Sequence, residues 1–450
     1  MDRRGFLAGS AALALAPRPS LSQPSTRLRP APARQSLVGA AHPATEVWAY
    51  NGTVPGPVLR YRRGERLRVE VENALDAETT VHWHGIRLPN AMDGVPHLTQ
   101  PPIAARGGRF RYEFDLPDAG TFWYHPHLGS AEQVARGLAG ALIVEEPDAP
   151  AVERDLVWLL SDWRLDRQAR LVADFASRMD ASHAGRIGNT VTLNGVVPET
   201  FAVRAGERLR LRLINASNAR IYGLTFEGHE PRIIALDGHP VEPHWDGRVV
   251  LGPGMRADLI LDCGAAPGST HRIVDRFYRD RAYELLKIQY RKEAPLRESF
   301  APVPRLPGNP VAQPDVTRAQ RHRIVFAGGM MGALPDQARH KGMFWTVNGK
   351  PVAEHSHDEP LLQLKRDQSH VIELVNDTSW HHPIHLHGHV FRVLTRKGKE
   401  AARQWADTVL LDPHTRAEIA LVADNPGDWM LHCHVLEHQA SGMMAVVRVA

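Results

Sequence analysis

Cysteine, net charge and long apolar segments are all scarce in this sequence. Its 450 residues include two cysteines, and 54 basic against 50 acidic side chains leave a net charge of +4. Such a small excess gives no strongly basic surface, which argues against a nucleic-acid partner. Outside the N-terminus, no apolar segment approaches the roughly 20 residues that a membrane-spanning helix needs. We therefore expect no nucleic-acid partner and no stable membrane span.

The two cysteines, Cys263 and Cys433, allow at most one disulfide. Cys433 lies between His432 and His434, where a metal ligand is the better interpretation. We therefore expect no structural disulfide, and we expect Cys263 to be a buried thiol.

The N-terminus holds the one marked apolar stretch. It runs from Gly5 to Ala16 and follows the pair Arg3-Arg4. Paired arginines before a short apolar core with small residues are typical of a twin-arginine signal, and the stretch is too short to span a bilayer. The sequence therefore predicts a signal peptide over about residues 1–23, recognition by the twin-arginine export machinery, and a periplasmic protein.

Long amphipathic helical patterns are scarce as well, whereas 36 glycines and 34 prolines suit many turns and short strands. The sequence contains three internal repeats. Each repeat has an Asn-Gly turn, a gap, and a strand of alternating apolar and polar residues that ends at asparagine. The turns are Asn51-Gly52, Asn194-Gly195 and Asn348-Gly349, and the closing asparagines are Asn73, Asn215 and Asn376. Alternation with period two is expected of a sheet with one face in a core. We predict an all-β chain of three β-sandwich domains over 37–148, 152–292 and 317–450, with a Pro-rich linker over 301–314.

Histidine, in contrast, is abundant, with 25 residues. Four short segments concentrate it: His82-Trp83-His84; His125-Pro126-His127; His382-Pro383-Ile384-His385-Leu386-His387; and His432-Cys433-His434, followed by His438 and Met443. Chance alone gives about one His-x-His pair in a chain of this composition. Four pairs at equivalent strand ends of the first and third repeats are therefore a signal.

The spacing of these pairs has a physical reason. On an extended strand, residues i and i+2 point to the same face, so each His-x-His offers two imidazoles to one site. His432 and His434 then face one metal centre while Cys433 faces a second. A thiolate, two imidazoles and a weak thioether make a type 1 blue copper site, for which we expect Cys433, His438, Met443 and His382. The other eight histidines are too many for one ion and suit a small cluster that holds and reduces O2.

With these motifs the sequence resembles the multicopper oxidases, a family that includes laccases, cuprous oxidases and ascorbate oxidases, over essentially the whole mature chain. The resemblance implies three consecutive cupredoxin-like Greek-key β-sandwich domains and four copper ions per chain. Carried over position by position, it implies type 1 ligands at His382, Cys433, His438 and axial Met443, and a type 2 pair at His82 and His385. The type 3 set is then His84, His125, His127, His387, His432 and His434.

Three acidic residues resemble functional carboxylates of the family. Asp93, nine residues after His84, matches an acid near the type 2 copper and the O2 channel. Glu437, just before His438, matches a carboxylate that relays protons, which O2 reduction consumes. Asp407 lies in a segment similar to one beside the type 1 histidines, where it is expected to orient a substrate.

The resemblance implies a reaction in which a reductant gives single electrons to type 1 copper and O2 is reduced to water at a trinuclear cluster. We expect a small substrate (a phenol, an aromatic amine or Cu(I)) to dock by His438 or His382, and electrons to pass through Cys433. The second domain holds no ligands, so its expected part is spacing and the shape of the substrate cleft. The final motif resembles copper-efflux oxidases, but their long methionine-rich insertion is missing, which favours organic reductants. Met330, Met331 and Met343 are interpreted as core or loop filling.

Two alternatives stay open at this point. A copper nitrite reductase also uses type 1 copper, but the resemblance there is to two-domain subunits without the full set of His-x-His motifs. A non-catalytic periplasmic cupredoxin-like protein, serving copper sequestration or cell division, is the alternative from another class. Counting bound copper discriminates between these possibilities.

Overall fold

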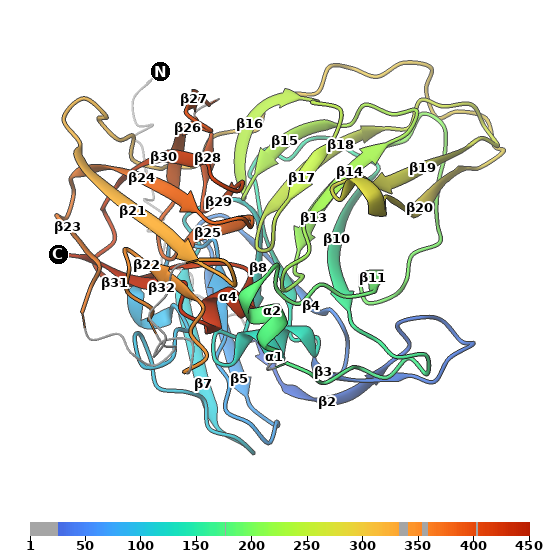
Figure 1. Ribbon diagram of the computed structural model, residues 1–450. Helices are drawn as coiled ribbons and strands as arrows, with labels where there is room; N and C mark the ends of the chain where they lie inside the picture. The colour runs from blue at the N-terminus through green and yellow to red at the C-terminus, as the bar shows by residue number, and fades with distance from the viewer. Residues whose placement is uncertain (1–25, 176, 333–340, 353–358, 402–403) are drawn as a thin grey trace, which may run out of the picture.

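The computed structural model describes residues 26–175, 177–332, 341–352, 359–401 and 404–450. These residues form three β-sandwiches (Figure 1), and the predicted signal peptide over 1–23 lies outside them. Helices are few and short within this part of the chain: α1 (Ser130–Ala135), α2 (Arg178–Ser182) and α4 (Leu436–Ala440), with 3-10 turns η1 (Asn90–Met92) and η2 (Arg279–Arg281). None of these described helices is long and apolar enough to cross a membrane.

The first sandwich (residues 26–145) faces a three-stranded sheet with a four-stranded one and adds a hairpin. In strand β5, Leu67, Val69 and Val71 are all fully buried and alternate with more exposed residues, as period two predicts. Residues 26–36 precede the domain start predicted at 37, yet they belong to this sandwich because β1 pairs with β5 and β2 pairs with β3. The strands are β1 (Thr26–Leu28), β5 (Arg66–Glu72) and β7 (Arg109–Asp115); β4 (Gly56–Arg62), β9 (Gly140–Glu145), β8 (Gly120–His125) and β6 (His82–His84); and the hairpin β2 (Pro30–Gln35) and β3 (Thr45–Tyr50).

The second sandwich (residues 154–290) has its own core between a six-stranded and a five-stranded sheet. Cys263 lies in this core as a free thiol, as predicted, and burial raises its pKa to about 12. In order across each sheet the strands are β11 (Thr190–Leu193), β10 (Arg154–Trp163), β13 (Arg208–Asn215), β18 (Arg256–Asp262), β15 (Arg232–Leu236) and β16 (His239–His244); and β12 (Thr200–Val203), β20 (Tyr283–Tyr290), β19 (Thr270–Asp275), β14 (Tyr222–Phe226) and β17 (Val249–Leu251).

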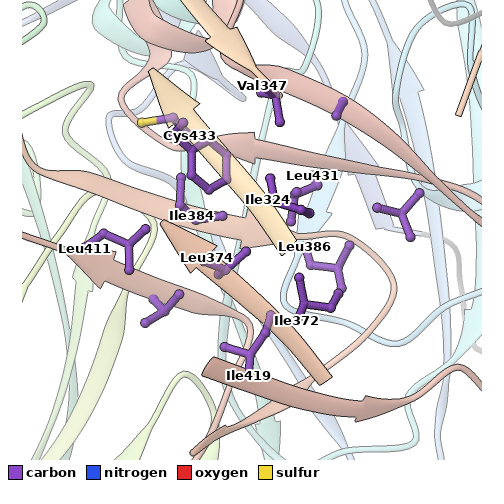
Figure 2. Close-up of a cluster of buried hydrophobic side chains, with 14 of the residues drawn as sticks. Ile324, Val347, Ile372, Leu374, Ile384, Leu386, Leu411, Ile419, Leu431 and Cys433 are labelled. Atoms are coloured by element: carbon purple, nitrogen blue, oxygen red, sulfur yellow. The ribbon is translucent and has the colours of Figure 1, made fainter. Parts of the chain in front are cut away.

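The third sandwich (residues 320–449) encloses the hydrophobic cluster of Figure 2, in which Ile384, Leu386 and Leu431 pack together and Cys433 contributes its sulfur. One sheet contains β22 (Trp345–Val347), β21 (Gln320–Gly328), β24 (Ser369–Asp377), β30 (Arg416–Val422), β26 (Phe391–Arg396), β27 (Lys399–Glu400) and β28 (Trp405–Ala406). The other contains β23 (Leu362–Leu364), β32 (Met444–Val449), β31 (Gly427–Cys433), β25 (His382–Leu386) and β29 (Thr408–Leu411).

The three sandwiches share one connectivity. Each has one parallel pair per sheet: β1 with β5 and β4 with β9, β10 with β13 and β12 with β20, and β21 with β24 and β23 with β32. A parallel pair cannot be joined by a tight hairpin, so the chain crosses between the sheets, as in a Greek key. The predicted all-β fold of three cupredoxin-like sandwiches is confirmed.

The structure shows why asparagine recurs at these positions of the three repeats. Asn51, Asn194 and Asn348 adopt φ between 49° and 54°, the left-handed region that tight hairpin turns require. At the strand ends, the Asn73 amide donates to the carbonyls of Ala77 and Ile103, and Asn215 and Asn376 make equivalent bonds. Each therefore satisfies backbone groups where the chain leaves the sheet.

Candidate metal centres

Strand pairing brings the four histidine segments together in twos. In the first sandwich, β6 pairs with β8 so that His82 lies opposite His125. In the third, β25 pairs with β31 so that His385 lies opposite His432. All ten predicted imidazole ligands have at most 1% of their surface exposed. The first and third sandwiches thus each present a histidine-bearing edge, and eight of the rings meet between them.

The eight rings form one continuous cluster, in which the shortest centroid spacings are 3.8 Å for His84–His385 and 3.9 Å for His82–His387. The ligand assignment implied by the resemblance divides this cluster into two triads and a pair. Within the first triad, ring centroids lie 4.9 Å apart for His84–His434, 5.3 Å for His125–His434 and 5.9 Å for His84–His125. Within the second, His127, His387 and His432 are separated by 4.9–5.2 Å. His82 and His385 form the pair, at 5.8 Å. We call these eight residues the histidine cluster; each of its three groups takes rings from both sandwiches.

In most rings of the histidine cluster, one nitrogen makes a hydrogen bond and the other has no hydrogen-bond partner within the described residues. The Nδ1 atoms of His82, His125 and His385 bond backbone oxygens at 2.8–2.9 Å. His84 is the reverse, because its Nε2 bonds the carboxylate of Asp407 at 3.2 Å and its Nδ1 is bare. Within the described chain, the buried nitrogens of the cluster without a partner are His82 Nε2, His84 Nδ1, His125 Nε2, His127 Nε2, His385 Nε2 and both nitrogens of His434.

So many orphaned nitrogens in one place fit a metal cluster. A buried polar atom without a partner costs about 1–3 kcal/mol, so natural proteins rarely accumulate them. Burial, reinforced by the neighbouring rings, lowers the pKa of His125, His127 and His434 well below the usual value. These three rings are therefore neutral, and each offers a lone pair to a metal ion.

A second, smaller group contains the thiol. Cys433 Sγ lies 3.4 Å from His382 Nδ1 and 3.7 Å from His438 Nδ1, and the two nitrogens are 3.1 Å apart. Thr378 Oγ1 and the His183 carbonyl hold the Nε2 atoms of these rings at 2.8 and 2.7 Å, which aims both Nδ1 atoms at the sulfur. We call His382, Cys433 and His438 the thiolate site.

Met443 and Trp345 close the thiolate site. Met443 is fully buried, and its carbonyl accepts a hydrogen bond from the backbone of Cys433. The Trp345 ring packs on His438 at 4.2 Å between centroids. Burial raises the pKa of the Cys433 thiol, so the thiolate form depends on a bound metal. A thiolate with imidazoles and a thioether suits copper.

As predicted, Cys433 and its two histidine neighbours point to opposite sides of the strand. His432 lies in the second triad and His434 in the first, while the sulfur between them joins the thiolate site. The two centres are thus connected through a few covalent bonds of β31.

Asp93 lies against the histidine cluster. Its Oδ2 accepts a hydrogen bond from His387 Nδ1 at 2.8 Å, and its Oδ1 is 3.3 Å from His82 Nδ1. The carboxyl group is fully buried. Asp93 therefore fixes the orientation of one ring of the second triad and one ring of the pair.

Asp407 lies elsewhere than expected. It is 0% exposed and contacts His84 and His385 of the histidine cluster, with its carboxylate paired to Arg256. The expectation that it orients a substrate beside the type 1 histidines is wrong, because a fully buried, paired carboxylate cannot meet a docking molecule.

Glu437 is buried on α4 and faces the second sandwich. Its carboxylate accepts hydrogen bonds from the Arg186 backbone at 3.0 Å and from Asn218 Nδ2 at 2.7 Å. Burial raises its pKa. Its role as a proton relay stays a prediction.

The thiolate site is covered. His382 and His438 are both 0% exposed, so a substrate that docks by one of them would be separated from the ring by the covering segment. The covering segment belongs to the second sandwich: the His183 carbonyl bonds His438 Nε2, and the Ala181 carbonyl accepts from Trp345 Nε1 at 2.6 Å. In Figure 1, α2 of this segment lies beside α4 at the middle of the molecule.

Sequence reasoning missed His183 and Arg256, which contact the centres from the second sandwich. Neither belongs to a local pattern: His183 is a lone histidine, and Arg256 lies 151 residues from Asp407. Only the packing of three domains brings them to the site.

Two buried groups of imidazoles, one with a thiol and a thioether, define a protein that holds several copper ions. Three family models, each described as multicopper oxidase, match residues 34–149, 154–285 and 332–450. The multicopper oxidase MmcO of Mycobacterium tuberculosis is 30% identical over 467 residues, which cover 92% of this chain and 85% of that protein. A solved multicopper oxidase from Pseudomonas thermotolerans is 38% identical with a TM-score of 0.85, covering 95% of this chain and 99% of the other. Lac15, from a marine microbial metagenome, is 38% identical with a TM-score of 0.76 and coverage of 95% and 100%.

The chain belongs to the multicopper oxidase family. Copper is its cofactor, with four ions per chain, and it is a copper-dependent oxidoreductase with O2 as acceptor. The non-catalytic alternative finds no support in these similarities.

Proposed function

We propose that the thiolate site, with Met443, takes single electrons from a reductant and that the histidine cluster is where O2 is reduced to water. In this assignment His382, Cys433, His438 and Met443 hold type 1 copper and the pair His82 and His385 holds type 2 copper. The two triads hold the type 3 coppers: His84, His125 and His434, and His127, His387 and His432. The observation that carries the proposal is the set of buried histidine nitrogens that have no hydrogen-bond partner in the described residues. They belong to the histidine cluster, which includes the two residues on either side of Cys433.

Copper supplies the one-electron redox couple of both centres when it is bound. The chain's own part is to connect and insulate them. Cys433 shares peptide bonds with His432 and His434, so the thiolate site and the histidine cluster are joined by a short covalent path along which electrons would pass. Burial of every predicted ligand would keep bulk water out of the site where bound copper reduces O2.

We propose Asp93 as the carboxylate that supplies protons at the histidine cluster, with Glu437 as a second one further out. O2 reduction consumes four protons per molecule, and positioned carboxyl groups deliver protons efficiently. Support for Asp93 is its contact with rings of both the pair and the second triad, at 3.3 and 2.8 Å. Glu437 is supported by its burial and raised pKa.

We propose that electrons enter through the segment that covers the thiolate site. His183 donates no side-chain atom to the site, but its carbonyl bonds His438 Nε2 at 2.7 Å, which gives a path from the surface to a type 1 ligand. The ring of His183 packs edge-on against Trp380 at 5.8 Å, and the Trp380 ring lies beside Gly329, the residue after β21.

Three exposed methionines near this segment favour Cu(I) as the reductant. Met179 on α2 is 62% exposed, and Met330 and Met331 are 45% and 83% exposed. The backbone of Met330 bonds the Ser182 carbonyl, which places the two segments side by side. Thioethers are soft ligands that select Cu(I), and the exposure of Met330 and Met331 excludes the core-filling half of the role expected from the sequence. Phenols and aromatic amines are the second candidates.

The substrate proposal is tested by initial rates of Cu(I) oxidation and of phenol oxidation, the latter with and without added Cu(II). Met179→Leu, Met330→Leu and Met331→Leu keep the apolar volume and remove the sulfur, and Val197→Leu is the control at another exposed apolar residue. We expect the combined methionine variant to lose Cu(I) oxidation while direct phenol oxidation is kept. Equal losses for both substrates, or none, contradict the proposed Cu(I) role.

We also propose that the protein is exported to the periplasm by the twin-arginine route, on the strength of Arg3-Arg4 and the apolar stretch after them. Arg3→Lys with Arg4→Lys is expected to leave the protein in the cytoplasmic fraction. Unchanged export of this variant contradicts the route.

A further inference from the structure

Arg256 of the second sandwich is fully buried where all three sandwiches meet. Its NH1 and NH2 donate to the two carboxylate oxygens of Asp407 in the third sandwich, at 2.9 and 2.5 Å. Its Nε donates to the Thr121 carbonyl of the first sandwich at 3.1 Å. A two-pronged pair of this kind fixes the plane of the carboxylate as well as its position.

Asp407, held in this orientation by Arg256, in turn contacts two rings of the histidine cluster. Its Oδ1 lies 3.2 Å from His84 Nε2, and its backbone carbonyl accepts from His385 Nδ1 at 2.9 Å. Both Asp407 oxygens accept hydrogen bonds from the Arg256 guanidinium, an arrangement that requires the carboxylate form. An ionised carboxylate only accepts hydrogen bonds, so the proton of the neutral His84 ring must be on Nε2. The lone pair of His84 is then on Nδ1, the atom that has no partner in the described chain.

The backbone at Gly254 and Gly85 packs closely around the Arg256–Asp407 pair and the histidine rings. Arg256 NH1 also donates to the Gly254 carbonyl at 3.0 Å. A Cβ at Gly254 would lie 2.8 Å from His434 and 3.0 Å from His84, and a Cβ at Gly85 would lie 2.6 Å from the Asp407 carboxylate. The second sandwich therefore forms a wall of the histidine cluster although it supplies none of the predicted ligands.

We propose that Arg256 is a positioning residue of the O2-reducing centre: through Asp407 it sets the tautomer and ring orientation of His84, so that Nδ1 rather than Nε2 faces the metal. His82, His125, His127 and His385 instead leave Nε2 bare, which makes His84 the exception. This inference rests on the proposed function, because it presumes that the first triad binds copper. Mutation of a residue that hydrogen-bonds a metal-bound histidine typically lowers metal affinity or activity by about 10–100-fold.

The competing explanation is that Arg256 only joins the domains. Arg210 offers a matched control because it is equally buried in the second sandwich and its guanidinium pairs with Glu146 and Asp258. No contact with a ring of the histidine cluster is recorded for Arg210 in the described residues. Arg210→Gln thus removes a buried ion pair without touching the cluster.

The test compares Arg256→Gln and Arg210→Gln in the copper-loaded full chain. Copper content and the electron paramagnetic resonance (EPR) spectrum report the histidine cluster, and the blue absorption of the thiolate site is the internal reference. For Arg256→Gln we expect unchanged blue absorption, an altered type 2 EPR signal with added intensity from an uncoupled type 3 pair, and kcat lower by about 10–100-fold. For Arg210→Gln we expect a lower thermal midpoint and wild-type EPR.

Asp407→Asn decides the matter if Arg256→Gln does not fold, because the amide has almost the same shape and can donate to His84 Nε2. We expect it to reproduce the altered EPR spectrum. Wild-type EPR and copper content in Arg256→Gln, or in Asp407→Asn, overturn the inference. A wild-type protein without any type 2 or type 3 copper would instead overturn the proposed function, so the two failures are distinguishable.

Discussion

Gly254→Ala tests how closely the second sandwich packs on the histidine cluster. Gly254 has φ of +83°, and a Cβ there would lie 2.8 and 2.9 Å from Cδ2 and Cγ of His434 and 3.0 Å from Cε1 of His84. These are ring atoms in a packed interior, so they cannot swing away as the end of a flexible side chain could. Left-handed backbone costs alanine roughly 1–2 kcal/mol, and overpacking of this kind costs about 1–3 kcal/mol more.

Gly247→Ala is the matched control for this prediction. Its φ is +79° and nothing lies within 4 Å of its Cβ position, so only the backbone cost of about 1–2 kcal/mol applies. We expect the urea midpoint of metal-free Gly254→Ala to fall further than that of Gly247→Ala. Copper-loaded Gly254→Ala should also show a disturbed type 3 pair with normal blue absorption. Equal midpoints and identical EPR spectra for the two variants would refute the packing described for this wall.

Other predictions follow from individual residues. Thr378→Val removes the hydrogen bond to His382 Nε2 at 2.8 Å, and we expect a shifted blue absorption with an unchanged EPR signal of the histidine cluster; no shift contradicts the role of Thr378 in aiming that ring. Asp93→Asn should lower turnover more than tenfold with copper content kept, as measured by O2 consumption; full turnover argues against Asp93 as the proton source. Burial lowers the pKa of His239 to about 4, so the native state disfavours its protonation and the stability it contributes, present above the ordinary pKa of 6.5, is lost as pH falls toward 4. That loss is about 3 kcal/mol in total, and His239→Gln should flatten the pH dependence of the urea midpoint in this window; an unchanged slope contradicts it. Removal of copper should lower the thermal midpoint, because a ligand that binds only the native state stabilises it; equal midpoints with and without copper contradict that coupling.

The fold was predictable because its signals are local and repeated. Leu67, Val69 and Val71 alternate with polar residues, and the sheet they form needs only that pattern and an Asn-Gly turn before it. The domain start at 37 was set too late because the pairing of β1 with β5 joins residues 43 positions apart, which no local pattern reveals.

The candidate ligands were predictable for a related reason. The His-x-His spacing of His432 and His434 encodes a shared face, and Cys433 between them encodes a second centre. The environment of the ligands was not predictable in this way. The cover over His438 and the Arg256–Asp407 pair depend on contacts across 255 and 151 residues, which only the packing of three sandwiches creates.

The measurement that tests the account most directly is copper content with EPR and absorption spectra of wild type and Cys433→Ser. Cys433 is the one thiol of the two centres, and its sulfur lies 3.4 and 3.7 Å from the His382 and His438 nitrogens. We expect four copper ions in the wild type, and loss of the blue absorption and of oxidase activity in Cys433→Ser with the type 2 signal retained. A blue, fully active Cys433→Ser protein, or a wild type that binds one copper or none, would contradict it.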